Sequence, residues 1–261
     1  QKIEEGRPFF AGRIGAYEFN YISRTIVEQK LGITLPMTAK LRAGGNNCGF
    51  YPVTKESLKR FSDLMVWATG QADFIAQMNL DLYSWYLKQY LPSSSCISQF
   101  RSLDFYRYKR PFTRALAGKK VLVIHPFAES IEQQYKKREQ LFPDTEILPS
   151  FSLQTLKAVQ TIAGNRDSRF PTWFDALDYM TKECEKRDFD IALLGCGAYG
   201  FPLAARIKAM GKVALHLGGV TQLLFGIWGK RWDLEPEAVK YRNSFWISPP
   251  AQERPEGFDT I

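Results

Sequence analysis

The sequence has few of the residues that build metal and redox sites. It contains two histidines, His125 and His216, and this number excludes a histidine-rich metal centre. Its four cysteines stand far apart, so there is no Cys-x-x-Cys metal clip or redox pair. Scattered single cysteines are typical of reduced, intracellular proteins. The motifs GxxxxGK[ST], GxSxG and HExxH are also absent, which excludes a P-loop, a serine-hydrolase elbow and a zincin helix.

Long apolar runs are missing as well. The longest uncharged stretches, 191–205 and 213–229, are broken by glycines and polar residues, and neither reaches the ~20 apolar residues of a membrane-spanning helix. Of the 261 residues, 45% are hydrophobic and 24% charged, which excludes a disordered or fibrous chain. The formal net charge of +8 favours anionic partners, among which we expect phosphorylated small molecules or an acidic membrane face and no nucleic acid.

Strand and helix patterns alternate along the chain. We predict strands at 9–14, 95–100, 121–124, 190–194 and 212–217. We predict helices at 16–31, 55–69, 73–90, 152–163, 172–187 and 201–210, and a Gly/Asn loop at 42–52. This alternation predicts one α/β domain over residues 1–261, doubly wound, with a mostly parallel sheet and helices on both faces. Residues 54–90 are interpreted as a helical insertion or lid.

The sharpest local motif is GCGAYG at 195–200, a G-x-G-x-x-G between a predicted strand and helix. Gly195, Gly197 and Gly200 would let the backbone approach a phosphate, and the helix N-terminus would supply free N–H donors. A dinucleotide site also needs an acid at the end of the next strand, and none is present there. An NAD(P)-dependent oxidoreductase, or a tight turn without a ligand, stays an alternative.

Polar residues follow the predicted strands at the edge where ligands bind in open parallel sheets. After the first strand come Arg13, suited to a phosphate, then Gly15 and Glu18, suited to a divalent ion or a base. Acids in first helical turns are also common because they complement the helix dipole. His125 and His216 each end a predicted strand and are suited to acid, base or phosphate-binding roles, with a buried structural histidine as the alternative.

Two further segments have the composition of binding loops. After His216 come Gly218 and Gly219, and then Lys230 and Arg231, which would add phosphate contacts. Three aromatic residues are candidates for stacking on a sugar or base: Tyr199, Trp228 and Trp232. The polar segment 42–51 is of the kind that lines sites. A buried aromatic loop and a surface turn are the plain alternatives.

Taken together, these blocks resemble a GT-D-type glycosyltransferase-like family of surface-polysaccharide biosynthesis proteins. The matching stretches are GRIGAYEFN (12–20), NNCGFYP (46–52), LAGKKVLVIHPFAESIEQQYKKREQLF (116–142), AVQTIAG (158–164), WFDALDYM (173–180), DFDIALLGCGAYGFPLAARIKAMGK (188–212) and HLGGVTQLLFGIWGKRW (216–232). The blocks 119–142 and 188–232 are specific, and the others are weaker.

The resemblance implies a Rossmann-like sheet and sugar transfer from a nucleotide donor. In GT-D enzymes the first strand–helix turn typically carries an Asp-x-Glu that binds a divalent ion, Mn²⁺ or Mg²⁺, and the donor diphosphate. Glu18 matches the second acid, but Ala16 replaces the first and leaves the metal in question. Glu18 would then serve as general base, and Arg13, Lys230 and Arg231 would offset the diphosphate charge.

The sequence therefore predicts a nucleotide-sugar-dependent glycosyltransferase. We expect a UDP-type donor, a glycan or lipid-linked acceptor, and a cytoplasmic protein that visits the membrane face. The high aromatic content, 14%, is consistent with a homodimer. A non-catalytic nucleotide-binding protein is a further alternative, because Ala16 departs from the family pattern.

Overall fold

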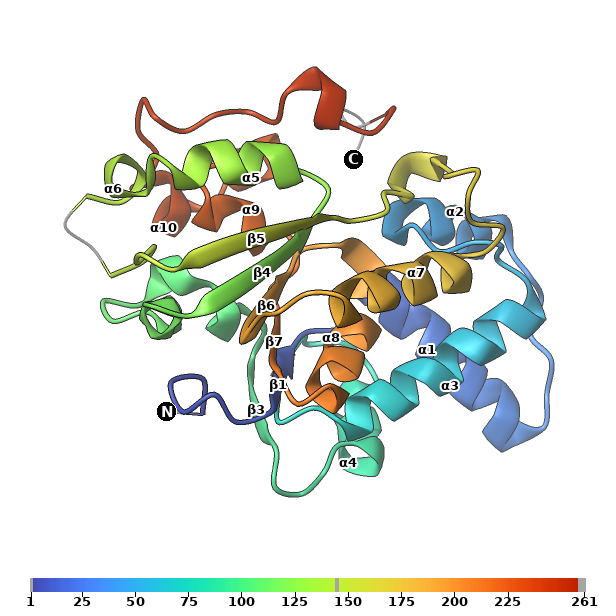
Figure 1. Cartoon of the computed structure of the whole chain (residues 1–261). Coiled ribbons are helices and arrows are strands. Elements are labelled where there is room, and N and C mark those ends of the chain that lie inside the picture. Colours follow the sequence, from blue (N-terminus) through green and yellow to red (C-terminus); the bar gives the residue numbers. More distant parts are fainter. Residues whose placement is uncertain (1, 144–145, 258–261) are drawn as a thin grey trace.

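The computed structural model describes residues 2–143 and 146–257, in which seven strands form one parallel sheet (Figure 1). The strand order is β3-β2-β1-β7-β6-β4-β5, and every pairing of neighbours is parallel. The strands are β1 (Phe9–Gly12), β2 (Phe74–Gln77), β3 (Cys96–Gln99), β4 (Lys120–His125), β5 (Ser152–Lys157), β6 (Ile191–Leu194) and β7 (Val213–His216). The predicted α/β fold with a parallel sheet is confirmed.

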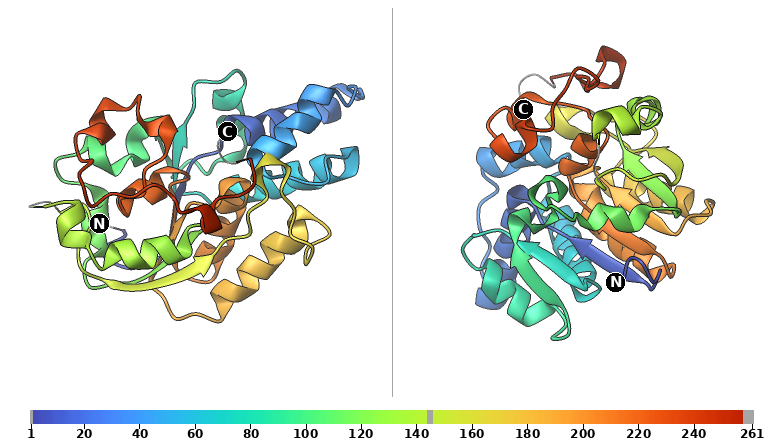
Figure 2. Two further views of the ribbon diagram at one scale, coloured as in Figure 1. Left: turned by 90° about the horizontal axis from the view of Figure 1, so that it is seen from above. Right: turned by 90° about the vertical axis from the view of Figure 1, so that its left-hand side faces the viewer.

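Helices cover both faces of the sheet (Figures 1 and 2). One face carries α1 (Ala16–Leu31), α3 (Lys55–Gly70), α4 (Tyr83–Tyr90), α7 (Trp173–Glu185) and α8 (Gly200–Ala209), with α2 (Ala39–Cys48) beside them. The other face carries α5 (Ala128–Tyr135), α6 (Arg138–Leu141), α9 (Val220–Leu224) and α10 (Pro236–Val239). Capping boxes at Thr54 and Thr172 start α3 and α7, because each threonine hydroxyl accepts the amide three residues on.

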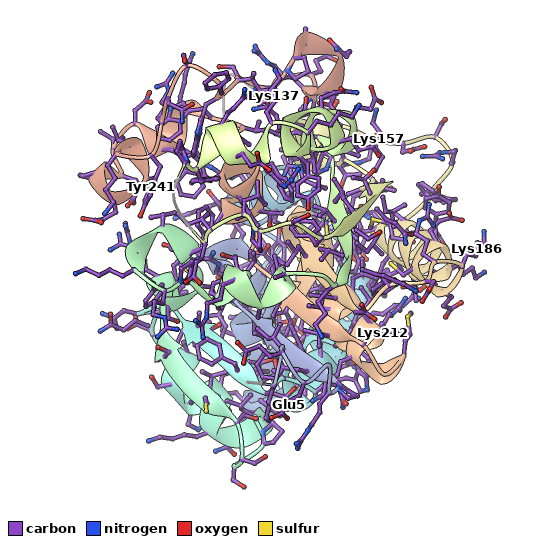
Figure 3. The ribbon with its side chains drawn as sticks, turned by 60° about the vertical axis from the view of Figure 1, so that its left-hand side comes forward. Glu5, Lys137, Lys157, Lys186, Lys212 and Tyr241 are labelled. Atoms are coloured by element: carbon purple, nitrogen blue, oxygen red, sulfur yellow. The ribbon has the colours of Figure 1, made fainter. Side chains whose placement is uncertain are left out.

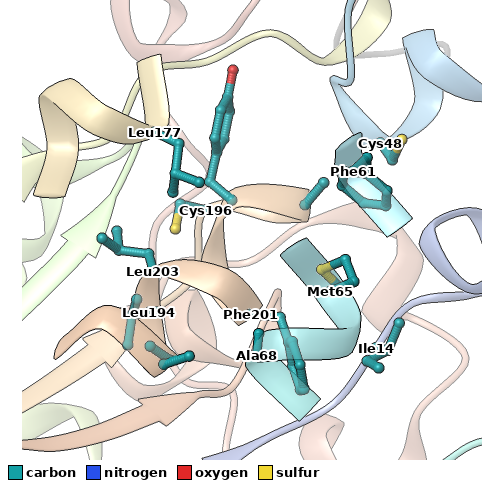
Figure 4. Packing of buried hydrophobic residues seen from close by; sticks show 14 of the residues in the cluster. Ile14, Cys48, Phe61, Met65, Ala68, Leu177, Leu194, Cys196, Phe201 and Leu203 are labelled. Atoms are coloured by element: carbon teal, nitrogen blue, oxygen red, sulfur yellow. The ribbon is translucent and has the colours of Figure 1, made fainter. Parts of the chain in front are cut away.

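The two faces of the sheet form two separate apolar clusters. Along β4, Leu122 and Ile124 face the α3–α8 side, whereas Val121 and Val123 face the α5–α9 side. This alternation follows from the two-residue period of a strand, and both sets are buried as a parallel sheet requires. Figure 4 shows the first cluster, in which Phe61 of α3 and Phe201 of α8 lie among buried aliphatic side chains.

The region 54–90, predicted as a helical insertion, belongs to the main fold, with α3 and α4 on one face of the sheet and β2 among its strands. α3 packs against α1 and α8, and β2 pairs with β1 and β3. The predicted helix at 73–90 is therefore wrong in its first part. The short segment 74–77 pairs with β1 and β3 as a strand and does not continue into the helix α4. The predicted helix at 152–163 is wrong for the same reason, since 152–157 form the edge strand β5.

The predicted loop at 42–52 is instead largely helical, because α2 extends to Cys48. Thr38 caps this helix by accepting the amide of Leu41. Its glycines serve close packing: a Cβ at Gly45 would lie 2.7 Å from the carbonyl oxygen of Phe50. Among the helices of the described residues, none is both long and apolar enough to cross a membrane.

Candidate functional site

A cleft of about 260 Å³ opens at the carboxyl ends of β4, β6 and β7. The chain leaves β6 toward α8 on one face, whereas it leaves β4 and β7 toward α5 and α9 on the other face. Neighbouring connections that depart in opposite directions leave a crevice at the sheet edge, which is where open α/β sheets bind ligands. The lining residues are Asn47, His125, Pro126, Phe127, Gln160, Ile162, Gly195, Cys196, Gly197, Gly218, Gly219, Gln222, Gly229, Lys230 and Arg231.

Four of the predicted glycines line this cleft, and the backbone explains why they are glycines. Gly197 and Gly218 have φ angles of 58° and 62°, in the left-handed region that side chains disfavour. At Gly219 a Cβ would collide with the guanidinium of Arg231. Gly197 and Gly219 also stand at the starts of helical turns, where the first amides have no intrahelical acceptor. The cleft therefore exposes backbone where a side chain would block it.

His125 borders the cleft as a neutral hydrogen-bond donor. Its Nδ1 accepts the amide N–H of Phe127 at 3.0 Å, which places the proton of the neutral ring on Nε2. Burial, and to a smaller extent the positive charge of Arg231, lower its pKa to about 3. At neutral pH the ring is therefore uncharged and is not the phosphate-binding cation that the sequence suggested. It is not a free base either, because Nδ1 already accepts a hydrogen bond and Nε2 carries the proton.

Lys230 and Arg231 supply the positive charge of the cleft. Arg231 extends over Gly219, with its guanidinium carbon 4.9 Å from the ring centre of Trp232. Surrounding protein atoms, and then the charge of Arg13, lower the pKa of Arg231, although its side chain keeps contact with solvent. Within the described ranges no carboxylate pairs with it. An arginine without an anionic partner in a cleft is available for one from a ligand.

The cleft contains no Asp or Glu among its lining residues. Elsewhere the positive charge is spread out: Figure 3 shows Lys137 before α6, Lys157 at the end of β5 and Lys186 after α7, well apart from one another. In the part of the chain that the structure describes, no three His, Cys, Asp or Glu side chains are grouped as a metal site requires. The donor set does not fit a divalent cation, because hard cations need several oxygen ligands and Glu18 stands without a second carboxylate.

Glu18 lies outside the cleft lining, in the first turn of α1. Its carboxylate folds back over Gly15, which is why a side chain at Gly15 would collide with it. Burial raises the pKa of Glu18, and its charge acts on the nearby Cys48 and Tyr21. Cys48 at the end of α2 lies near both places: the charge of Glu18 acts on it, and its carbonyl oxygen is 3.6 Å from the position of a Cβ on Gly197, which lines the cleft.

Arg13 is buried in a structural network. It pairs with Asp104 at 3.0 Å and donates from Nε and Nη2 to the carbonyl oxygen of Leu217 at 3.1 and 2.6 Å. These bonds tie the end of β1 to the chain that leaves β7, next to Gly218. Arg13 is therefore not among the residues that line the cleft, and each of its three guanidinium nitrogens already donates to the protein.

His216 and Gly200 also lie outside the cleft lining. The ring of His216 packs against Gly200, where a Cβ would collide with it. Both ring nitrogens are buried without a hydrogen bond of ordinary geometry, and burial lowers the pKa of His216 to about 3. The backbone of Arg13 and of Gly197 favours the protonated form only weakly against this burial.

Two of the three candidate stacking residues, Tyr199 and Trp228, are buried, and Trp232 is partly buried. The ring of Tyr199 stacks on Trp173 with centroids 4.9 Å apart, and its hydroxyl bonds Thr161. Trp228 is buried and donates its Nε1–H to Asp233 at 2.7 Å. Trp232 lies under Arg231. None of the three is among the residues that line the cleft.

Three polar side chains in the cleft were not singled out by the sequence: Asn47, Gln160 and Gln222. Asn47 belongs to the segment 42–51, whose polar composition did indicate a site. Gln160 follows the edge strand β5, and Gln222 lies in the short helix α9, where its Nε2 donates to the carbonyl of Ile227 at 3.0 Å. No motif in the neighbouring sequence identifies these two glutamines, because it is the tertiary packing that brings them to the cleft.

Comparison with protein-family models matches residues 72–224 to the GT-D fold-like domain. The matched range contains six of the seven strands, together with His125 and the cleft glycines from Gly195 to Gly219. It ends before Lys230 and Arg231 and begins after Glu18. No curated protein and no solved structure matches. Since the family model covers more than half of the sequence, the chain belongs to the family of GT-D fold-like domains.

Proposed function

We propose that this protein transfers a sugar from a nucleotide-sugar donor, of UDP type, to a glycan or lipid-linked acceptor. The observation that carries the proposal is the cleft at the carboxyl edge of the sheet: it combines two cations with exposed glycine backbone and no carboxylate. A diphosphate needs this environment, because its charge requires cations and N–H donors and is repelled by acids.

The chemistry follows from the groups in the cleft. Breaking the bond between sugar and nucleotide leaves negative charge on the diphosphate. Lys230 and Arg231 offset that charge, and Nε2–H of His125 donates a hydrogen bond to a phosphate oxygen. These donors take the place of a divalent ion, for which Glu18 alone is an insufficient ligand set.

Glu18 is the proposed base for the acceptor hydroxyl. Its raised pKa makes the carboxylate a stronger base than an exposed glutamate. It belongs to the β1 side of the carboxyl edge, and Cys48 at the end of α2 lies both near it and beside Gly197 of the cleft. In this proposal the acceptor approaches from the β1 side and the donor lies over β6 and β7.

A second function, nucleotide binding without catalysis, is favoured by one specific observation. The cleft itself has no carboxylate, and Nε2 of His125, the ring nitrogen not bonded to the backbone, carries the proton. The lining therefore offers no group that could act as a general base. The same lack of an acid argues against NAD(P), because the ribose hydroxyls of NAD are usually bound by an Asp or Glu after the second strand of the motif.

Titration calorimetry with UDP, UDP-sugars and NAD, in the presence of EDTA, tests the site. We expect UDP to bind without a metal and NAD not to bind. Arg231→Gln should weaken UDP binding about 10-fold, the scale of one charge-assisted hydrogen bond. Arg110→Gln removes an exposed arginine outside the cleft and is the matched control. Unchanged UDP affinity in folded Arg231→Gln contradicts the proposal. A second assay, which measures transfer of sugar from the donor to acceptors in an extract, then distinguishes a transferase from a protein that only binds the nucleotide.

A further inference from the structure

A second hollow, unrelated to the cleft, lies between α1 and α4. It measures about 250 Å³, and its lining is almost wholly apolar. The lining residues are Phe19, Ser23, Ile26, Val27, Lys30, Leu31, Leu82, Trp85 and Tyr86. The ring of Phe19 forms its floor, packed against Tyr83 and Tyr86 with centroids 4.4 and 5.6 Å away. We call this space the α1–α4 hollow.

Two large aliphatic side chains at the α1–α4 hollow are exposed to solvent. Leu31 is 66% exposed and Leu82 is 52% exposed. Leu82 also has a φ of 63°, the left-handed region that a leucine adopts only at an energetic cost. The chain therefore keeps a large apolar residue both strained and exposed at the mouth of an apolar hollow. Strained residues and exposed apolar side chains both concentrate at binding sites, so together they make this hollow a candidate for one.

A polar hollow of about 410 Å³ adjoins the first one and shares Ser23, Val27 and Leu82 with it. Its other lining residues are Asn20, Arg24, Leu35, Thr38, Lys40 and Leu41. Arg24 is held by Glu28 at 3.0 Å and by the carbonyl of Leu35 at 2.6 Å. Lys40 is exposed, and no carboxylate in the described ranges pairs with it. The apolar α1–α4 hollow thus continues directly into a more polar one, in which Lys40 is the cation without a carboxylate partner among the described residues.

We propose that the two adjoining hollows bind one single-chain lipid phosphate. Its hydrocarbon chain lies in the α1–α4 hollow against Trp85, and its phosphate lies in the polar hollow beside Lys40. The positive charge of Lys30 and Lys40 favours a lipid phosphate in these hollows over a second copy of the chain. A symmetric dimer through this face would cover Lys30 and Lys40 with a surface that has no Asp or Glu among its lining residues, and would add to the repulsion between two chains of net charge +8.

The site stands independently of sugar transfer. Neither hollow shares a lining residue with the cleft at the ends of β4, β6 and β7. Loss of lipid binding would therefore leave the proposed donor site untouched, and the failure of UDP to bind would leave the lipid site untouched.

A chain-length series of alkyl phosphates, used below their micelle-forming concentrations, tests the proposal. Each buried methylene strengthens binding about 4-fold, so dodecyl phosphate should bind about 15-fold more tightly than decyl phosphate. Inorganic phosphate should neither bind measurably nor compete. Equal affinities for the two chains would overturn the apolar part of the site. Binding of dodecyl maltoside as tight as that of dodecyl phosphate would overturn its anionic part.

Two variants locate the site. Leu82→Gly removes the apolar side chain and relieves the backbone strain, so the fold should be at least as stable while affinity for dodecyl phosphate falls about 10-fold. A bromine-labelled alkyl phosphate should quench tryptophan fluorescence in the wild type and not in Trp85→Phe, since bromine quenches only on contact. Unchanged affinity in Leu82→Gly, or quenching that persists in Trp85→Phe, would place the lipid elsewhere and overturn the proposal.

Discussion

The imidazole of His125 lies so close to the backbone of Gly195 that a Cβ on that glycine would be 2.5 Å from His125 Cδ2. The same Cβ would lie 2.7 Å from the Cβ of Thr221 in α9. The end of β4, the turn after β6 and the start of α9 therefore meet at a glycine. This contact fixes the His125 ring, whose Nδ1 accepts the amide of Phe127, at the cleft.

We expect Gly195→Ala to destabilise the protein by about 1–3 kcal/mol, because the methyl group overpacks a site with no room for it. Urea unfolding measures this change. Gly70→Ala is the matched control: it adds the same methyl at the end of α3, where the nearest atom would be 3.8 Å away, and it should be neutral or stabilising. Equal stability of the two variants would contradict the packing described here.

The two histidines should make stability fall in acid. Burial lowers the pKa of both to about 3 from an ordinary value of 6.5, so between these pH values the unfolded chain binds protons that the folded chain does not. The free energy of unfolding then decreases as pH falls from 6.5 toward 3, by at most ~1.4 kcal/mol per pH unit for each histidine. The positive charges of Arg231 and Arg13 act in the same direction, on His125 and His216 respectively.

Glu18 contributes a pH dependence of the opposite sign. Its pKa is raised in the folded state because burial favours the protonated form, so its contribution to the free energy of unfolding increases as pH falls.

The histidine prediction is tested by measuring the free energy of unfolding as a function of pH in the wild type, His216→Gln and His125→Asn. Each variant should lose its histidine's share of the slope between pH 4 and 6.5, whatever its absolute stability. A slope unaltered in either variant would show that the histidine titrates normally in the folded protein.

The C-terminal segment is held across the carboxyl edge of the sheet by Glu253. Its buried carboxylate accepts the amides of Glu129 and Ser130 at 3.0 and 3.3 Å and the hydroxyl of Ser130, at the start of α5. The side-chain amide of Asn165 holds the carbonyl of Glu256 at 2.9 Å. Figures 1 and 2 show this segment passing over α5 toward the loop that carries Asn165.

We expect Glu253→Ala to cost about 1–2 kcal/mol of stability, the usual effect of removing a carboxylate from a helix N-terminus. The loss should appear in urea unfolding and as faster proteolysis of the C-terminal segment. Glu256→Ala is the control, because only its backbone carbonyl is bonded to Asn165. If Glu253→Ala were as protease-resistant as Glu256→Ala, the carboxylate would not anchor the segment.

Local sequence predicted those parts of the fold and site that depend on backbone geometry. Gly197 and Gly218 could be placed at the ligand edge because a tight turn after an apolar strand needs a positive φ. Short elements such as β2 and β5 could not be assigned, since four to six apolar and polar residues satisfy a helical period as well as a strand pairing.

The separation of Arg13 from the cleft was beyond a local reading as well. Nothing in residues 9–18 reveals that Asp104 and the carbonyl oxygens of Phe100 and Leu217, all far along the chain, bind this guanidinium. The residues around an arginine at the end of a strand are the same whether its acidic partner is a ligand or another residue of the protein. Only the tertiary structure distinguishes the two: here Arg13 is bonded to the protein itself, whereas no carboxylate in the described ranges pairs with Arg231.

The position of Glu18 yields the sharpest test of catalysis against binding alone. Glu18→Gln removes a carboxylate whose charged form is disfavoured by burial, so the fold should keep its stability or gain slightly. Because Glu18 lies outside the cleft lining, UDP affinity should not change. Sugar transfer should fall about 100-fold or more if the carboxylate takes the acceptor proton. The measurements are calorimetric titration with UDP and transfer of labelled sugar, with Glu28→Gln, on the same helix and away from the cleft, as the control. Full transfer by Glu18→Gln would assign the proton to another group, whereas reduced UDP affinity would place Glu18 in the donor site.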